Sequence, residues 1–178
     1  MKNPSRLVVA LAVSFLGICP AQEAQPEFEL KNVEVIEATL PNSEKPWLKI
    51  VANYSTTKEW TDSLSFNFYA IVQPSDGQSA QKARMLTGAT AYVNIPAGNH
   101  QAIVYMTPGA LERFGKPIAV SVDCFDGDEK RGSARSGGNI GELAQGNIRR
   151  YDGFLRGMQS TPWIVIDSGK TPDLFVPY

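Results

Sequence analysis

The sequence predicts an all-β protein, folded as an antiparallel β-sandwich with one short helix. Three observations predict this class. Apolar and polar residues alternate over most of the chain, turn-forming residues recur about every ten positions, and a single segment has helical spacing. Parallel α/β folds need a helix after each strand, and the sequence offers none in those places. We therefore expect about eight short strands in two packed layers.

The N-terminal segment has the pattern of a secretory signal peptide. Lys2 and Arg6 precede an apolar run over 7–18, which is too short to cross a bilayer as a helix. Cleavage after Ala21 is expected, because small residues stand at the positions that a signal peptidase reads. In the alternative, Cys19 is the lipidated first residue of a lipoprotein.

The expected organisation is a signal peptide over 1–21 and one domain over 22–178, with a C-terminal extension from about residue 140. Loss of Lys2 and Arg6 leaves 15 of the 17 basic residues against 18 acidic ones. This balance argues against nucleic acid as a partner, and no polybasic run favours a membrane surface. No later apolar stretch is long enough to be a transmembrane segment.

Two stretches show the clearest strand pattern, "WLKIVANY" and "LSFNFYAIV". In each, every second residue is apolar, which predicts one buried face. The predicted inward rows are Leu48, Ile50, Ala52 and Tyr54 in the first strand and Leu64, Phe66, Phe68, Ala70 and Val72 in the second. The polar segment "STTKEWTDS" connects the two predicted strands.

Other elements have local signals of their own. "FELKNVEVIEA" changes phase near Asn32, which predicts a β-bulge. "TAYVNI" and "HQAIVYM" are separated by Pro96 to Asn99, which predicts a turn between adjacent strands. "PGALERFG" predicts the helix, with Pro108 near its start and Gly115 as its stop. From Gly127 to Gly146 the sequence is rich in Gly, Ser, Asn and Arg, and it predicts exposed loop with one irregular strand at most. Further along, "PWIVID" is the expected last strand.

The stretch "VSVDCFDGDEK" raises the question of whether the chain carries a chemical site. Cys124 continues the alternating apolar row of "KPIAVSVDCF", so we expect it to point into the core as an inert residue. This row comprises Ile118, Val120, Val122 and Cys124. After cleavage at Ala21, Cys124 has no second cysteine with which to form a disulfide.

The acidic residues next to Cys124 do not have the ligand spacing of a calcium loop. They are Asp123, Asp126, Asp128 and Glu129. Asp126-Gly127 instead predicts a β-hairpin that joins the Cys124 strand to "EKRGSAR". A surface cation site and a pair of catalytic carboxylates are the alternatives.

Other catalytic motifs are weak or missing. His100 is the only histidine, which excludes a two-histidine metal site, and no Gly-x-Ser-x-Gly elbow accompanies it. "GGNIGELAQG" lacks the Lys-Ser/Thr of a phosphate-binding loop. We therefore expect no catalytic residue, no metal site and no cofactor, and the chain is not expected to be an enzyme.

Three aromatic residues are out of phase with the inward rows or lie in a polar segment, and they are the candidate ligand or partner contacts. They are Trp47, Trp60 and Tyr69. Outward aromatic side chains can stack on sugars or contact a protein. In the alternative, the C-terminal tail folds over this face and buries them through Trp163, Phe154 and Phe175. The tail also holds Arg149, Arg150 and Arg156, which form either a site for an acidic partner or a solvated edge.

The order of these signals resembles an immunoglobulin-like sandwich. The paired cysteines, the buried Trp and the tyrosine of antibody domains are missing, so the resemblance is to the architecture. The predicted class is thus an immunoglobulin-like antiparallel β-sandwich with one short helix and a C-terminal extension.

The chain also resembles a group of secreted immunoglobulin-like proteins associated with type IV pili in mucin-degrading verrucomicrobial bacteria. The resemblance rests on the signal peptide, the runs "W-L-K-I-x-A-x-Y" and "W-x-D-x-L-x-F-x-F-Y", and the turn from Ile95 to Gly98, and it covers residues 27–126. It implies a non-enzymatic protein, tied to a pilus or surface assembly and reaching host cells. It supplies no functional motif, so no site residue follows from it.

These observations favour a secreted binding or structural protein of a bacterial cell surface, located in the periplasm or on the outer surface. Its expected partners are proteins of a surface or type IV pilus assembly, with host glycans or host cells as further candidates. The alternative is a carbohydrate-binding module that uses the exposed aromatic residues. A hydrolase that uses acids in the region 123–129 is a third hypothesis.

Overall fold

The computed structural model describes residues 26–41, 44–73, 83–138, 148–167 and 173–174. Its elements are β1 (Phe28–Thr39), β2 (Pro46–Val72), β3 (Arg84–Met106), α1 (Pro108–Phe114), β4 (Pro117–Asp126), β5 (Glu129–Gly137), β6 (Arg149–Asp152), β7 (Leu155–Gly157), the 3-10 helix η1 (Met158–Ser160), α3 (Ile164–Asp167) and β8 (Asp173–Leu174). The predicted signal peptide and Cys19 lie outside these residues. Within the described ranges, every helix is too short or too polar to cross a bilayer.

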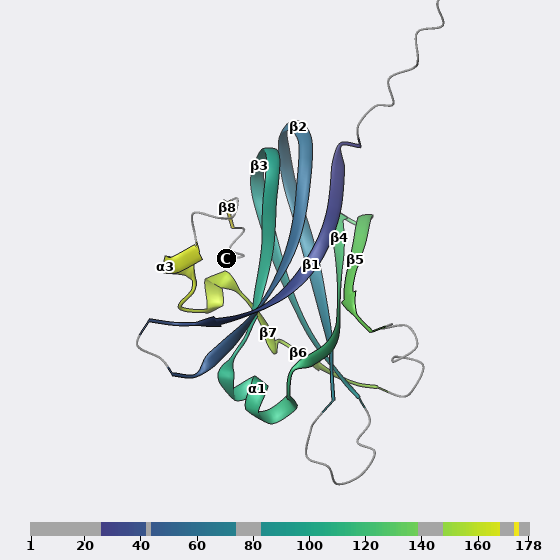
Figure 1. The fold of residues 1–178 in the computed structure, drawn as a ribbon. Coiled ribbons are helices and arrows are strands. Elements are labelled where there is room, and N and C mark those ends of the chain that lie inside the picture. The colour runs from purple at the N-terminus through teal and green to yellow at the C-terminus, as the bar shows by residue number, and fades with distance from the viewer. Residues whose placement is uncertain (1–25, 42–43, 74–82, 139–147, 168–172, 175–178) are drawn as a thin grey trace, which may run out of the picture.

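The architecture is the predicted all-β sandwich, built from one hydrogen-bonded network of strands. The strand order is β5-β4-β2-β3-β6, with β1 added to β2 and with β7 and β8 added to β3. Two antiparallel partners, β2 and β3, are far longer than the rest, and both double over at the same end of the molecule (Figure 1). The first layer holds β1, the first half of β2 and the second half of β3. The second layer holds β5, β4 and the other halves of β2 and β3.

The sequence prediction was wrong about the segments at this bend. "WLKIVANY" and "LSFNFYAIV" belong to a single strand, and Pro96 to Asn99 does not join two paired neighbours. Instead β2 and β3 stay paired through the bend, where the register shifts between Thr56 and Trp60 opposite Gly98 and Pro96. The physical reason is that β2 and β3 bend at the same point, so the two strands remain hydrogen-bonded to each other on both sides of the bend. The strain is taken up by Gly98 and Asn94, which have positive φ angles of 141° and 51°.

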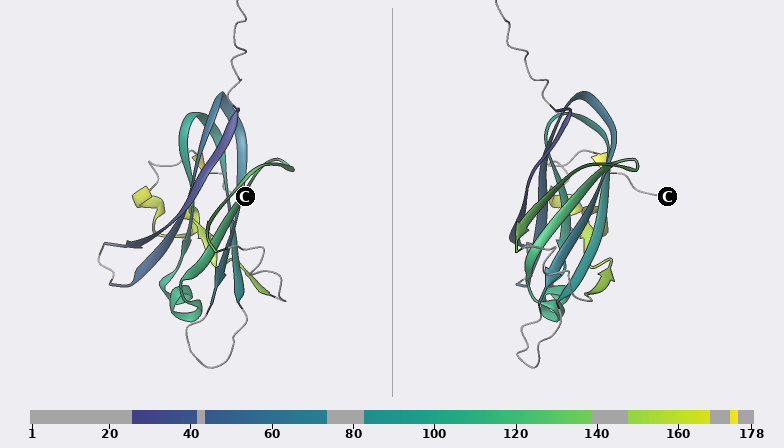
Figure 2. Two further views of the ribbon diagram at one scale, coloured as in Figure 1. Left: turned by 45° about the vertical axis from the view of Figure 1, so that its right-hand side comes forward. Right: turned by 90° about the vertical axis from the view of Figure 1, so that its right-hand side faces the viewer.

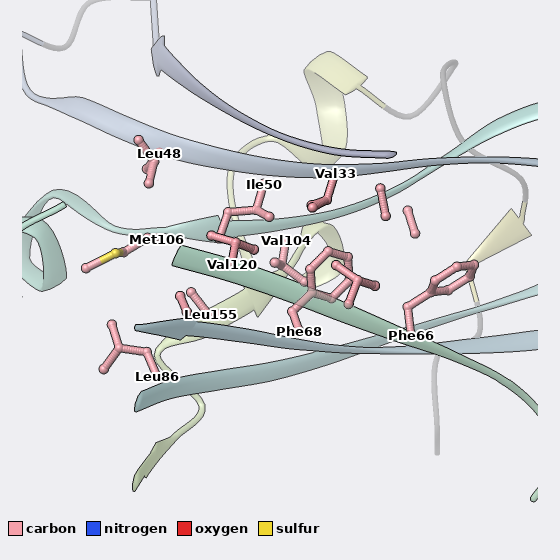
Figure 3. Packing of buried hydrophobic residues seen from close by; sticks show 14 of the residues in the cluster. Val33, Leu48, Ile50, Phe66, Phe68, Leu86, Val104, Met106, Val120 and Leu155 are labelled. Carbon is pink, nitrogen blue, oxygen red and sulfur yellow. The ribbon is translucent and has the colours of Figure 1, made fainter. Parts of the chain in front are cut away.

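The main core lies between the layers, and the predicted inward rows of β2 form most of it. All nine residues of those rows are buried, as are Val120, Val122 and Cys124 of β4. Side chains of Ile50 and Val104 from the first layer meet Phe68 and Val120 from the second (Figure 3). Ile118, which was expected to continue the β4 row, is 41% exposed because it lies at the start of the strand, outside the core.

A second, smaller cluster covers the outer face of the first layer. Val51, Ile103 and Tyr105 alternate with the inward residues of the same strands, and Met158 and Trp163 of the tail pack on them. The ring of Trp163 stacks on Tyr105 with centroids 5.4 Å apart. The tail is therefore part of the packed fold.

Two local predictions are confirmed. The register of β1 against β2 shifts between Leu30 and Asn32, as the change of phase predicted. Helix α1 begins after Thr107, whose Oγ1 accepts a hydrogen bond from the N–H of Ala110 at 3.2 Å. It ends at Gly115, with a positive φ of 78°.

"PWIVID" is not a strand, which corrects the prediction. Pro162 and Trp163 form a turn, and Ile164 to Asp167 form one helical turn, α3, in which the N–H of Ile166 donates to the carbonyl of Trp163 at 3.0 Å. The reason is that insertion of Trp163 against Tyr105 turns the chain away from any sheet edge. The following three residues, Ile164, Val165 and Ile166, are all exposed.

The tail crosses from one layer to the other and closes the open side of the sandwich. β6 runs parallel to β3 in the second layer, whereas β7 pairs with β3 in the first layer. At the crossing, the side chain of Leu155 packs in the core (Figure 3), and its main chain lies beside Gly88. A Cβ on Gly88 would lie 1.9 Å from the carbonyl oxygen of Leu155, so only glycine permits this approach.

Tyr92 holds the two halves of β3 together across the core. Its hydroxyl oxygen accepts a hydrogen bond from the main-chain N–H of Ile103 at 3.0 Å, and both groups are buried. Tyr92 lies in the second layer and Ile103 in the first. The hydroxyl thus satisfies a donor on the side of β3 that faces away from β2.

We expect Tyr92→Phe to lower the free energy of unfolding by about 1–3 kcal/mol, because it leaves the buried Ile103 N–H without an acceptor. Urea denaturation measures the change. Tyr54→Phe is the matched control, since the Tyr54 hydroxyl is buried and has no hydrogen-bond partner in the described part of the chain. Its loss should be neutral or slightly stabilising. An equal loss of stability in both variants would contradict the assigned role of Tyr92.

Candidate functional site

The region around Cys124 is a buried strand followed by a tight hairpin. Cys124 is fully buried and has no disulfide partner among the described residues. Burial, with a smaller contribution from the charge of Asp126, raises the pKa of its thiol to about 12. A thiol of this kind is protonated at neutral pH and is not a nucleophile.

The acidic residues serve the hairpin that the sequence predicted. β4 and β5 are joined by Gly127 and Asp128, and Gly127 has the positive φ of 58° that a tight turn requires. Asp123 accepts a hydrogen bond from Ser133 at 2.7 Å and pairs with Lys130 at 2.9 Å. In the part of the chain that the structure describes, no three His, Cys, Asp or Glu side chains gather as metal ligands would.

His100 lies at the bend of β3 and has a structural contact. Its Nε2 is 2.7 Å from the carbonyl oxygen of Pro96, and its ring lies 5.4 Å from that of Tyr54. Thr56 donates to the same carbonyl oxygen at 2.8 Å. These contacts tie the bent strand to its partner.

The three predicted contact residues lie on separate parts of the surface. Trp47 is half-buried and packs edge-on against Tyr105 and Trp163, at 6.5 Å from each. The tail covers it through Trp163, as the alternative expected. Trp60 is 60% exposed at the bend of β2, and Tyr69 lies near the far end of that strand. The three do not form one aromatic platform.

Phe154, the second tail residue in that alternative, packs elsewhere. Its ring lies 4.9 Å from that of Phe114 at the end of α1. Phe175 lies outside the described residues, as does most of "GGNIGELAQG".

Tyr69 instead lines a groove that the tail forms against the outer face of the second layer. The floor is made by β2 and β3, the wall by the segment from Arg150 to Ser160, and the volume is about 630 Å³. The polar side chains at this groove are those of Asn67, Tyr69, Thr87, Arg150, Asp152, Arg156, Gln159 and Ser160. We call it the tail groove.

A short network fixes one wall of the tail groove. Oδ1 of Asp152 accepts hydrogen bonds from Oγ1 of Thr87 and from Nε of Arg150, both at 2.6 Å. These bonds, first that from Thr87 and then that from Arg150, hold the pKa of the Asp152 carboxyl below its ordinary value of 3.8. Asp152 thereby orients Arg150 and joins β6 to β3.

This network predicts a pH dependence of tail docking. The pKa of Asp152 is lower in the folded state than in the unfolded state. The ionised carboxyl therefore stabilises the fold at pH values above the pKa of the unfolded state. This stabilisation is lost as the pH falls below 3.8 through the lowered folded pKa. Carbon-detected NMR titration of the carboxyl should show this low pKa, and Thr87→Val should move it upward. An unchanged pKa in Thr87→Val would contradict the role of the threonine.

The second half of β1 is an open strand edge. Among the described strands, β1 is paired with β2 alone. Its first half is closed by β5, where Phe28 and Leu30 approach Gly132. From Val33 to Thr39 this edge has no strand partner among the described residues, and the end of β1 and the start of β2 project from the body of the molecule (Figure 2). Val35 and Ile36, on opposite faces of the strand, are 39% and 43% exposed.

The fold and these surfaces define a β-sandwich with a polar groove and an open edge, and comparison with known proteins agrees on the fold. A protein-family model matches residues 11–121, more than half of the chain, so the chain belongs to the family that this model describes. A crystal structure of a protein from Akkermansia muciniphila superposes with a TM-score of 0.71. The match covers 85% of this chain and 94% of that chain at 18% identity, which shows a shared fold. No curated protein matches the sequence.

The sequence did not predict the tail groove or the position of the open edge. Clustered arginines in the tail were a signal for the groove, but their neighbours on β2 and β3 are far away in the sequence. The edge depends on which strands pair, and the alternating pattern of β1 carries no information about its second side.

Proposed function

We propose that this protein is a secreted, non-enzymatic binding protein of a cell-surface assembly, and that the assembly is a type IV pilus. The observation that carries the proposal is the open edge of β1 from Val33 to Thr39. Family membership and the structural match to a protein from a verrucomicrobial bacterium support it. The pilus itself comes from the sequence resemblance.

An open strand edge suits the assembly of protein chains. Its unpaired main-chain N–H and C=O groups can add a strand from a partner, and natural proteins normally cover or charge such edges. Here Glu34 and Glu37 supply some charge, with Glu37 paired to Lys116, but Val35 and Ile36 offer an apolar side chain on each face. A partner strand laid along β1 would cover both.

A non-enzymatic role accords with the chemistry of the described residues. The thiol of Cys124 is buried and protonated, and His100 is engaged at the bend of β3. The acidic side chain of Asp123 is tied to Ser133 and Lys130. Cys124, His100 and Asp123 therefore each have a structural environment of their own.

The test is affinity capture from envelope extracts of the native bacterium, with proteins identified by mass spectrometry. We expect the wild-type protein to enrich pilus subunits, and Ile36→Lys to reduce that enrichment at least about tenfold by placing a charge on the edge. Ile118→Lys, at a residue of similar exposure on a strand with two neighbours, is the matched control. Equal enrichment by Ile36→Lys, or capture without pilus subunits, would refute the proposal.

A further inference from the structure

We propose that the tail groove is a binding site for a sugar that carries one carboxylate, with a uronic acid as the simplest example. This site is separate from the open edge of β1, and the inference does not depend on the proposed role in an assembly. The groove's volume of about 630 Å³ lies in the range of small-molecule sites.

The charge of the groove selects a monoanion. Its lining contains two arginines, Arg150 and Arg156, and a single carboxylate, Asp152, with no lysine or glutamate. Asp152 engages Nε of Arg150, which leaves the two terminal nitrogens of that guanidinium for a ligand. No acidic side chain pairs with Arg156 in the described part of the chain. One excess positive charge thus faces the groove, on guanidinium groups suited to carboxylate.

The neutral polar side chains of the groove can form hydrogen bonds with hydroxyl groups of a ligand that also carries the carboxylate. Gln159 lines the wall, with its amide packed against Gly157. Asn67 and Tyr69 add an amide and a phenol from the floor. A sugar ring offers several hydroxyl donors and a flat face that can pack on Tyr69. A bare anion offers neither.

A peptide carboxylate fits the groove less well. A peptide terminus gains affinity by placing its last side chains in pockets. The large apolar residues at this groove, Phe68 and Leu155, point into the core, where they are 0% and 2% exposed. These two side chains are therefore not available to a ligand's apolar side chain.

The geometry is set by groups that hold the tail in place. Gly88 lets Leu155 enter the core, and the N–H of Gly153 donates to the carbonyl oxygen of Thr87 at 3.1 Å. Together with the bonds to Asp152, these contacts fix Arg150 and Arg156 relative to the floor. The site is therefore formed before the ligand binds, which lowers the entropic cost of binding.

The experiment is a titration of the purified protein with sodium glucuronate, followed by ¹H–¹⁵N NMR. We expect saturable shifts of the amides of Gly88, Gly153 and Gly157. Glucose, which lacks the carboxylate, and acetate, which lacks the hydroxyls, should each bind at least about tenfold more weakly. Arg150→Gln and Arg156→Gln should weaken glucuronate binding about tenfold without changing the melting temperature.

Arg149→Gln is the matched control. It removes the same charge, from the strand that carries Arg150, but Arg149 packs over Tyr151 at 5.1 Å and does not line the groove. Its affinity for glucuronate should equal that of the wild type. The proposal is overturned if glucuronate gives no saturable shift, if acetate or glucose binds as well, or if Arg149→Gln is as weak as the groove variants. Tighter binding of a short peptide with a free carboxyl terminus would overturn it too.

Discussion

Replacing Gly88 by alanine is expected to lower the free energy of unfolding by about 2–5 kcal/mol. The added Cβ would lie 1.9 Å from the carbonyl oxygen of Leu155 and 2.7 Å from its carbonyl carbon. Both contacts are to main-chain atoms, so no side-chain rotation can relieve them. The tail must move away, and the buried side chain of Leu155 must leave the core.

The same change should disturb the tail groove. Displacement of Leu155 moves Arg156 and Gln159, which line the wall of the groove. We therefore expect Gly88→Ala to speed proteolytic cleavage of the tail as well as to lower stability in urea. Gly109→Ala is the matched control, because a Cβ there meets no atom within 4 Å. It should leave stability unchanged or raise it, since alanine favours the helix. Similar destabilisation by both substitutions would contradict the close packing of the tail.

The second large effect is expected for Phe66→Ala, which should lower the free energy of unfolding by about 3–5 kcal/mol. Phe66 is fully buried in the second layer. Its ring lies 4.9 Å from Tyr54 of the first layer and 6.0 Å from Tyr92. Removal of the ring leaves a cavity where the two layers meet, and urea denaturation measures the cost.

Trp60→Ala is the control for loss of an aromatic ring as such. Because Trp60 is 60% exposed, its truncation should change stability by no more than about 0.5 kcal/mol. If the two variants lost similar stability, then Phe66 would not lie between two layers. A small effect of Trp60→Ala on stability also makes this variant suitable for tests of binding at the bend.

The sequence predicted well those features that depend on neighbouring residues. Alternation identified the inward rows of β2 and, apart from Ile118, of β4, and Cys124 lies in the core as its position in the row indicated. Pro108 and Gly115 marked the helix, and Asp126-Gly127 marked the hairpin. Each of these signals is local, because strand alternation, helix caps and tight turns each involve only a few consecutive residues.

Features that depend on distant partners were missed or predicted wrongly. Pro96 and Gly98 have the composition of a turn, yet β3 continues through them because β2 bends beside it. The branched residues of Ile164 to Ile166 favour a strand, but the stacking of Trp163 on Tyr105 turns the chain there. The tail groove needs Gly88 and Leu155 to meet, and no pattern within either segment encodes that contact.

We expect Cys124 to be unreactive because it lies in a core that excludes water. The most direct test is the rate at which iodoacetamide alkylates Cys124 at neutral pH. Mass spectrometry of the peptide that contains Cys124 measures this rate. A thiol that is fully buried, with its pKa raised to about 12, should react at least about a thousandfold more slowly in the native protein than in urea. Alkylation of the native protein at the rate of the unfolded chain would contradict the sandwich core and the proposed non-enzymatic role together.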